Sequence, residues 1–154
     1  MLSITDMLRS INIDHIRSKF TYYHVIKLLD LIERHGPMGR QSISKILAIG
    51  EGSVRNLLRK MSHVSLVSID PVAGAILTGK GREILSVWRR YVSSTCIEGL
   101  DMINWRYASV NKISSEAKYI LMQNKNIIDL RDELVKRGCL GGLFVEVRGG
   151  RVML

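Results

Sequence analysis

The chain has 154 residues and a hydrophobic content of 46%, which is enough to bury a core in one compact unit or two small ones. Its formal net charge of +9 favours a polyanionic partner, either a nucleic acid or an anionic membrane surface. The two cysteines form no CxxC motif, and no apolar run approaches the roughly 18 residues of a spanning helix, so we expect a cytoplasmic protein without a disulfide scaffold, zinc knuckle, signal peptide or membrane segment.

The positive charge is concentrated in the first part of the chain. Residues 1–92 carry 14 Lys and Arg against 7 Asp and Glu, a net charge of +7. Residues 93–154 carry 9 Lys and Arg against 7 Asp and Glu, a net charge of +2. The first part is therefore the one expected to meet an anionic partner.

Two helices are predicted before residue 36. The first lies within an N-terminal helical extension, residues 1–20, and Ser3 is its candidate cap. The second spans about residues 22–35 and ends at the glycine and proline of "HGP". In both, apolar residues recur three to four positions apart: Ile4, Met7, Leu8 and Ile11 in the first, and Tyr22, Val25, Ile26, Leu29 and Ile32 in the second.

Two shorter helices follow, separated by a tight turn. The first ends at Ala48 or Ile49, and Gly50 then supplies a residue that tolerates a positive φ in the turn. The next helix spans residues 51–62 and has two unlike faces. Its apolar face consists of Val54, Leu57, Leu58 and Met61, and its opposite face of Gly52, Asn56, Arg59 and His63.

A β-hairpin and a fourth helix complete this region. The hairpin strands are predicted at residues 65–69 and 75–78, which are rich in branched aliphatic residues and joined by the turn formers of "DPVAG". Thr78 then caps a helix whose apolar positions continue to residue 92. The order helix, helix, turn, helix, hairpin, helix is that of a winged helix-turn-helix domain, which we expect over residues 21–92.

The remaining residues, 93–154, are expected to form a small α/β domain, so the fold class is α+β. A strand is predicted at 96–104 and a helix at about 126–137, with the i, i+4 pairs Asp132–Lys136 and Glu133–Arg137. Residues 114–122 fit either a strand or a helix. The stretches "LFVEV" and "RVML" predict a terminal hairpin with glycines at its turn. This domain either senses an unknown effector, mediates dimerisation or completes the fold.

The stretches that carry these elements are also similar to a known family. "HGPMGRQSISKILAIGEGSVRNLLRKM" and "GAILTGKGREIL" contain the patterns gly-pro-x-gly-arg, gly-glu-gly-x-val-arg and leu-thr-x-x-gly. They resemble the winged-helix segment of archaeal winged helix-turn-helix regulators that carry a C-terminal domain of unknown function, and more remotely bacterial sugar-responsive and iron-dependent repressors. "DLRDELVKRGCLGGLFVEV" resembles part of that C-terminal domain, with Cys139 where a small residue is common. The resemblance implies a DNA-binding transcriptional regulator.

The sequence departs from the family pattern at the hairpin. Ser65 stands where the family usually has a glycine before the first strand. No Lys or Arg occurs from Val64 to Gly79, so the hairpin is a poor candidate for binding phosphate. Lys80 and Arg82, just after it, are the nearest substitutes.

The helix at 51–62 has the features of a helix that enters the DNA major groove. Asn, Arg and Ser side chains at its start and exposed face pair with base edges, whereas flanking cations neutralise phosphates. We expect base contacts from Ser53, Asn56 and Arg59, and phosphate contacts from Arg40, Lys45, Arg55, Lys60, Lys80 and Arg82. A homodimer would present two copies of this helix to half-sites of double-stranded DNA about one helical turn apart.

Other interpretations of the same residues remain open. Cations opposite an apolar stripe are often only a solvated face, and the alternative role of Gly52 is close packing against the preceding helix. Trp88 and Tyr91 fit either the core or a dimer contact. The main alternative function is a winged-helix protein–protein interaction module without DNA binding. We expect no enzyme, cofactor or metal site, because no catalytic motif is present and His15, His24, His35 and His63 have no i, i+4 pairing.

Overall fold

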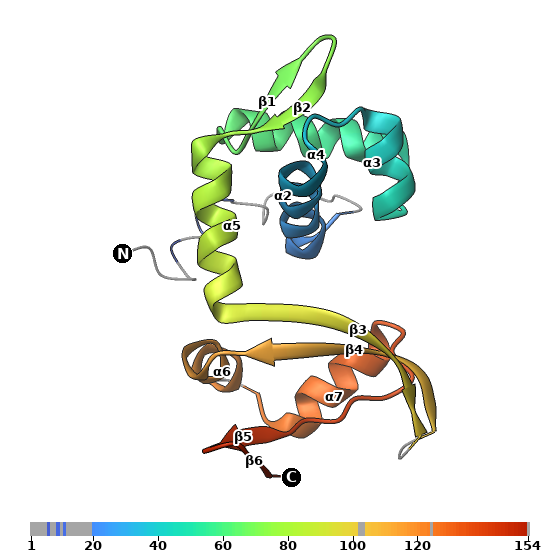
Figure 1. Cartoon of the computed structure of the whole chain (residues 1–154), viewed down its shortest axis with the longest axis vertical. Coiled ribbons are helices and arrows are strands. Elements are labelled where there is room, and N and C mark those ends of the chain that lie inside the picture. Colours follow the sequence, from blue (N-terminus) through green and yellow to red (C-terminus); the bar gives the residue numbers. More distant parts are fainter. Residues whose placement is uncertain are drawn as a thin grey trace. The chain divides into compact units, whose positions relative to one another are not determined.

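The computed structural model describes Asp6, Arg9, Ile11 and residues 20–101, 104–123 and 125–153 (Figure 1). This part of the chain is a mixed α+β structure with six helices and three two-stranded antiparallel sheets. The chain divides into two compact units, Met1–Lys112 and Ile113–Leu154. Most of the helix predicted within residues 3–20 lies outside the described residues, although Ile11 is buried.

Helix α2, Tyr22–His35, has the predicted bounds. The Thr21 backbone N–H at its start donates a hydrogen bond of 3.0 Å to Nδ1 of His24. At its end Gly36 has a φ of +77° and its N–H bonds the carbonyl of Ile32, as the glycine and proline predicted. The buried face of α2 is the centre of the core of the first unit and consists of Val25, Ile26, Leu28, Leu29, Leu31 and Ile32.

Helices α3, Arg40–Leu47, and α4, Glu51–His63, are joined by a three-residue turn. The expectation that Gly50 would adopt the positive φ is wrong: Ala48 has a φ of +53°, whereas Gly50 has a φ of −60° and caps α4. The hydroxyl of Ser44 donates a 2.7 Å hydrogen bond to the Ile49 carbonyl and fixes the turn. The residue with the left-handed conformation is therefore Ala48, directly after α3, and helices often end with a residue in this conformation.

The hairpin consists of β1, Val67–Asp70, and β2, Gly74–Leu77. Strand β1 begins two residues later and ends one residue later than predicted, and β2 begins and ends one residue earlier than predicted. Val67 lies opposite Leu77, and Asp70 opposite Gly74. Ser65, which stands where the family that the sequence resembles usually has a glycine, has a φ of +61°, so a non-glycine residue adopts the left-handed conformation here. Backbone hydrogen bonds between Met38 and Ala75 attach the hairpin to the loop between α2 and α3.

Helix α5, Gly79–Tyr91, begins with the predicted cap. The Thr78 hydroxyl accepts a hydrogen bond from the Gly81 N–H at 3.0 Å. Gly81 packs so closely that an added Cβ would lie 2.2 Å from the Leu66 carbonyl oxygen. The helix buries Ile84, Leu85, Val87 and Tyr91, while Trp88 is half-buried. The arrangement from α2 to α5 is compatible with a winged helix (Figure 1).

The first unit also contains most of a long two-stranded ribbon, β3, Val92–Leu100, and β4, Trp105–Ile113. The strand predicted at 96–104 thus begins earlier and ends earlier than expected, and sequence analysis missed β4. A ribbon exposed on both faces lacks the alternation of apolar and polar residues that identifies a half-buried strand.

The second unit contains α6, Ser115–Met122, α7, Ile127–Lys136, and the hairpin of β5, Glu146–Arg148, with β6, Arg151–Met153. The stretch left open at 114–122 is therefore mostly helical, and the predictions of α7 and of the terminal hairpin are confirmed. Glu133 pairs with Arg137 at 2.8 Å as expected. The other expected pair is wrong, because Asp132 contacts Arg131 at 3.1 Å instead of Lys136.

Candidate nucleic-acid interface

Helix α4 separates its apolar and polar residues onto opposite faces. Its buried face is the predicted one: Val54, Leu57 and Met61 are 0% exposed and Leu58 is 5% exposed. Asn56 and Arg59 lie on the exposed side of the helix. The four buried residues fix the rotation of α4 about its axis, and this rotation turns Asn56 and Arg59 to solvent.

The exposed polar groups of α4 are available to a partner. Within the described ranges, the side chains of Arg55, Asn56 and Arg59 make no hydrogen bond or ion pair with another residue. An amide offers a donor and an acceptor side by side, and a guanidinium offers a planar fork of donors. These groups match the paired donors and acceptors that bases present in the major groove.

The first turn of α4 is open on its outer side. An added Cβ at Gly52 would meet no atom within 4 Å, so Gly52 does not serve close packing against α3. Ser53 is half-buried and its N–H bonds the Gly50 carbonyl at 2.8 Å. Glu51 is exposed in the same turn, where its charge stabilises the helix N-terminus but repels phosphate.

Glu51 is also a candidate that sequence analysis missed. A carboxylate at the start of a groove-reading helix accepts a hydrogen bond from the amino group of cytosine. The available signal was its position four residues before Arg55, which places both side chains on neighbouring turns of one face.

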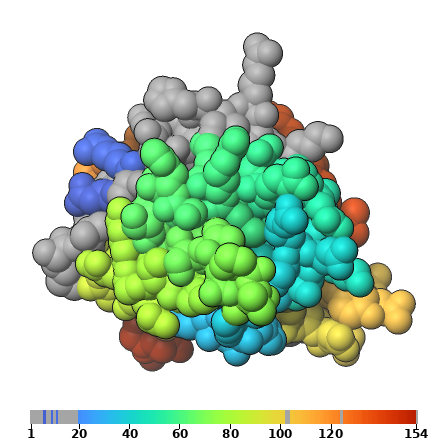
Figure 2. All heavy atoms as spheres, turned by 90° about the horizontal axis from the view of Figure 1, so that it is seen from above, coloured from blue at the N-terminus to red at the C-terminus, as the bar shows by residue number. Residues whose placement is uncertain are grey.

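Cationic side chains surround α4 on the same unit. Arg40 and Lys45 are exposed on α3, Arg55 is exposed on α4, and Arg82 is exposed on α5. Figure 2 shows α3, α4, the β1–β2 hairpin and the start of α5 together on one face of the molecule. Side chains of this type and exposure suit contacts to phosphate.

Two of the candidate lysines are less available to a partner than the other cations, one through burial and one through a hydrogen bond. Lys60 is half-buried. Lys80 is exposed, but its Nζ donates a 3.0 Å hydrogen bond to the Val64 carbonyl at the end of α4. Lys80 thus also satisfies a carbonyl at a helix C-terminus, a structural task that leaves it two N–H donors.

The tip of the β1–β2 hairpin has an acidic and apolar surface. Hydrogen bonds from the backbone N–H groups of Ala73 and Val72 hold the pKa of Asp70 below its ordinary value, so Asp70 stays negatively charged. Val72 at the tip is 97% exposed and Ile69 is 50% exposed. This tip does not fit a phosphate backbone.

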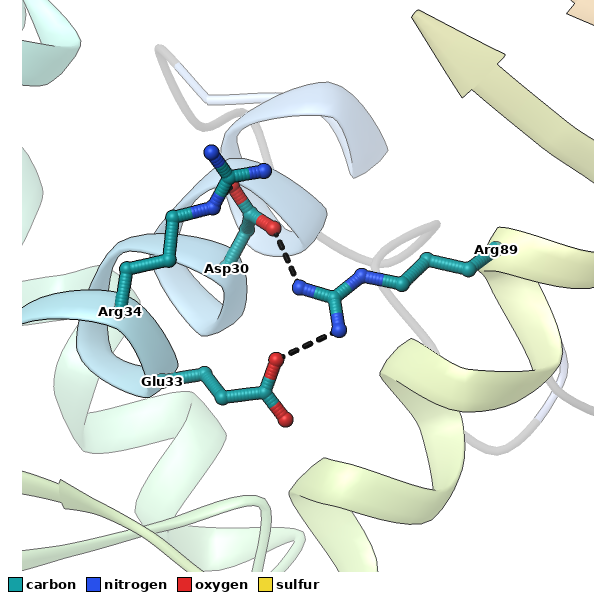
Figure 3. A network of polar contacts seen from close by, with 4 residues as sticks. All are labelled: Asp30, Glu33, Arg34 and Arg89. Carbon is teal, nitrogen blue, oxygen red and sulfur yellow. Dashed lines mark hydrogen bonds and ion pairs between the residues drawn. The ribbon is translucent and has the colours of Figure 1, made fainter.

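Arg89 does not contribute to the cationic surface, because carboxylates on α2 neutralise it. Its guanidinium contacts Asp30 at 2.7 Å and Glu33 at 2.6 Å, and Asp30 also contacts Arg34 at 2.9 Å (Figure 3). Burial alone would raise the pKa of Asp30, but the hydrogen bond from Arg89 and the charge of Arg34 outweigh it and lower this pKa. The network joins α5 to α2, the central helix of the core.

Among the residues that the structure describes, no three His, Cys, Asp or Glu side chains come together in a way that would hold a metal ion. None of the described helices is long and apolar enough to cross a membrane.

A family model matches the part of the chain that carries the candidate interface, and one solved structure matches most of the chain. Residues 24–83 match the model of the family described as PH0730-like, N-terminal domain. The hypothetical protein PH0730 from Pyrococcus horikoshii OT3 has a similar structure, with a TM-score of 0.66 and 27% sequence identity. The match covers 87% of this chain and 65% of that chain, so the chain spans slightly less than two thirds of the relative. No curated protein matches the chain.

Proposed function

We propose that the protein is a DNA-binding transcriptional regulator with a winged helix-turn-helix domain, and that α4 enters the major groove of double-stranded DNA. The observation that carries this proposal is the division of α4 into a fully buried apolar face and an exposed face with Asn56 and Arg59. The tight turn from α3, fixed by Ser44, supports the helix-turn-helix geometry. The structural match to a protein from Pyrococcus horikoshii supports an archaeal source for the chain, and we place the proposed regulator in the cytoplasm.

The base-reading residues in this proposal lie along one side of α4. Arg59 pairs with guanine through its two parallel N–H donors, and Asn56 pairs with adenine through its amide. Ser53 in the first turn reaches a base edge at the groove floor. The open space around Gly52 supports a close approach of the helix start to DNA.

The phosphate contacts in this proposal come from three helices. Arg40 and Lys45 hold the strand that α3 crosses, and Arg55 and Lys60 flank the reading face of α4. Arg82, assisted by Lys80, replaces the cations that the hairpin lacks. We propose a homodimer that binds two half-sites about one helical turn apart and needs neither catalysis nor a cofactor.

The second candidate function is a protein–protein interaction module without DNA binding. The exposed Ile69 and Val72 and the negative charge of Asp70 at the hairpin tip favour it. Exposed apolar residues rimmed by polar ones are a common feature of protein contact sites.

Selection of bound fragments from a random pool of duplex DNA tests the proposed function and separates it from the alternative. We expect the full chain to enrich one sequence motif. Its affinity for that motif should fall steeply between 50 and 200 mM salt, by roughly 10³-fold for about six phosphate contacts. A pool without any enriched motif, together with salt-independent capture of a protein partner, would instead support the interaction module.

A further inference from the structure

The end of helix α4 is closed by a Schellman motif, in which two N–H groups beyond a helix bond carbonyls of its last turn. The Leu66 N–H bonds the Met61 carbonyl at 2.7 Å, and the Ser65 N–H bonds the Ser62 carbonyl at 2.9 Å. Ser65, with its φ of +61°, takes the left-handed position of the motif. Leu66 and Met61, the positions that make an apolar contact in this motif, are both buried. The chain therefore leaves α4 in a defined direction.

The three carbonyl groups that follow α4 all accept hydrogen bonds from the start of α5. The Lys80 Nζ donates to the Val64 carbonyl at 3.0 Å. The Thr78 hydroxyl lies 2.7 Å from the Ser65 carbonyl oxygen and 3.0 Å from that of Leu66, and its single proton is shared between them. The Thr78 N–H also donates to the Leu66 carbonyl, at 3.2 Å. Thr78 and Lys80 therefore attach the end of α4 to α5, and we call these contacts the α4–α5 junction.

The α4–α5 junction is tightly packed and anchored to the core. The Thr78 hydroxyl also accepts the hydrogen bond from the Gly81 N–H at 3.0 Å, so it acts as a donor and as an acceptor. An added Cβ at Gly81 would lie 2.2 Å from the Leu66 carbonyl oxygen, so the start of α5 approaches the junction closely. Helix α5 buries Ile84 and Leu85 in the core. The junction therefore holds the end of α4 against an element that is itself fixed.

The junction controls a property of α4 that its buried face does not fix by itself. The buried face sets the rotation of α4 about its axis, whereas contacts at the two ends set the inclination of that axis. At the start of α4, the Ser44 hydroxyl bonds the Ile49 carbonyl at 2.7 Å, and at its end the α4–α5 junction has the corresponding role. Arg59 lies four residues before the last residue of the helix, about 6 Å along the axis. A shift of the helix end therefore moves Arg59 more than it moves the helix start.

We propose that Thr78 and Lys80 are positioning residues for DNA recognition, which hold the end of α4 at the inclination that brings Arg59 to its base. The inference rests on the proposed function and adds to it a determinant of specificity outside the reading helix. A guanidinium that pairs with guanine needs two N–H donors in line with two acceptors. A small displacement of the helix end therefore weakens the discrimination between bases more than it weakens contacts to phosphate.

The test measures the preference of the full chain for the selected duplex over a duplex changed at the base position where Arg59→Ala loses discrimination. Thr78→Val replaces the hydroxyl by a methyl group and changes no charge. The preference should fall at least about threefold, while the salt slope of binding stays the same. Because the preference is the ratio of two affinities of one sample, an unfolded fraction of the sample does not alter it. Thr78→Ser keeps the hydroxyl and should restore the wild-type preference.

Two further variants separate positioning from other roles. Ser114→Ala is the matched control for the loss of a helix cap, because Ser114 caps α6 of the second unit by accepting a 3.2 Å hydrogen bond from the Ala117 N–H. This variant should keep the wild-type preference. Lys80→Met removes the donor to the Val64 carbonyl and should also lower the preference. A lysine that only binds phosphate would instead weaken the binding of both duplexes equally.

The outcomes distinguish this inference from the proposed function. A wild type that prefers the selected base, together with a Thr78→Val protein that has the same preference, would overturn the inference and leave the proposed function intact. If circular dichroism shows that Thr78→Val is unfolded, an unchanged preference in Lys80→Met overturns the inference in the same way. A wild type that prefers no base would overturn the proposed function and this inference with it.

Discussion

At the scale of single residues, the orientation of Asn56 and Arg59 is set by four buried side chains on the opposite face of α4. Val54, Leu57, Leu58 and Met61 are at most 5% exposed, and their burial sets the direction in which α4 presents its polar face. Such a rigid platform positions groove-reading side chains with little ordering cost on binding. The proposed specificity therefore rests on core packing as much as on the polar residues themselves.

Gly52 and Gly81 provide a paired prediction at this scale. Gly52→Ala should stabilise the protein by up to about 1 kcal/mol, because its added Cβ meets open space and alanine favours a helix. Gly81→Ala should destabilise it by at least about 2 kcal/mol, because its Cβ would lie 2.2 Å from the Leu66 carbonyl oxygen. Urea unfolding of both variants measures the two changes.

The Gly52→Ala variant also tests whether the start of α4 approaches DNA. If the start of α4 approaches DNA closely, Gly52→Ala weakens duplex binding although it stabilises the fold. A Gly52→Ala protein with wild-type affinity would show that the helix start stays away from the groove. A destabilised Gly52→Ala protein would contradict the open space at that position.

Residue patterns predicted the buried face of α4 correctly, but they could not assign the conformation of the turn before it. Gly50 was the obvious residue for a positive φ, yet Ala48 adopts it, because the turn is fixed by the Ser44 hydrogen bond rather than by glycine content. Likewise, Ser65 has a left-handed backbone, a conformation that glycine adopts more readily. A side-chain hydrogen bond of this kind produces no regular spacing of residue types, so the sequence pattern does not reveal it.

At the scale of elements, the ion network between α2 and α5 contributes to stability in a pH-dependent way. The pKa of Asp30 is lowered in the folded protein, so the contribution is fully present above its unfolded pKa and is lost as the pH falls through the lower folded pKa. Arg89→Gln should lower stability at pH 7 by about 1 kcal/mol or less, because Arg89 is 45% exposed and solvent screens the pair.

Denaturant unfolding at pH 7 and pH 3 measures this prediction. The difference between wild type and Arg89→Gln should shrink at pH 3 as Asp30 is protonated. Arg90→Gln, an exposed neighbour on the same helix, is the control and should be neutral at both pH values. A difference that persists unchanged at pH 3 would assign the effect to packing of the arginine stem rather than to charge.

Sequence patterns predicted elements well where one face is buried and poorly where neither face is. Helices α2, α4 and α5 follow the 3.6-residue period because each packs a stripe onto the core. Strand β4 was missed, since its two exposed faces place no requirement on the order of apolar and polar residues. For the same reason α6, with Ala117 as its one buried residue, fitted a strand and a helix equally well before the structure.

At the scale of the whole molecule, the proposed function needs two copies of α4. The first unit carries the cationic groups around this helix. A dimer gains affinity for paired half-sites because the second contact becomes intramolecular. Because the hairpin tip carries no cation that binds phosphate, this gain contributes more to the total affinity.

The proposed dimer predicts a gain of affinity from paired half-sites. The wild type should bind a duplex with two half-sites at least tenfold more tightly than a duplex with one half-site. Fluorescence anisotropy with the two duplexes measures both affinities. Equal affinity for the two duplexes would contradict the proposed dimer.

The central claim is that α4 reads bases with Arg59 and holds phosphate with Lys60. The most direct test is the affinity of wild type, Arg59→Ala and Lys60→Ala for the selected duplex and for single-base variants of it, each over a range of salt concentrations. Arg59→Ala should lose about 1–3 kcal/mol of binding free energy on the selected duplex and cease to discriminate at one base position. Lys60→Ala should weaken all duplexes alike and reduce the salt slope by about 1. Arg90→Ala is the control and should behave as the wild type. Unchanged discrimination in Arg59→Ala, with affinity equal to that of the control, would contradict the assignment of α4 to the groove.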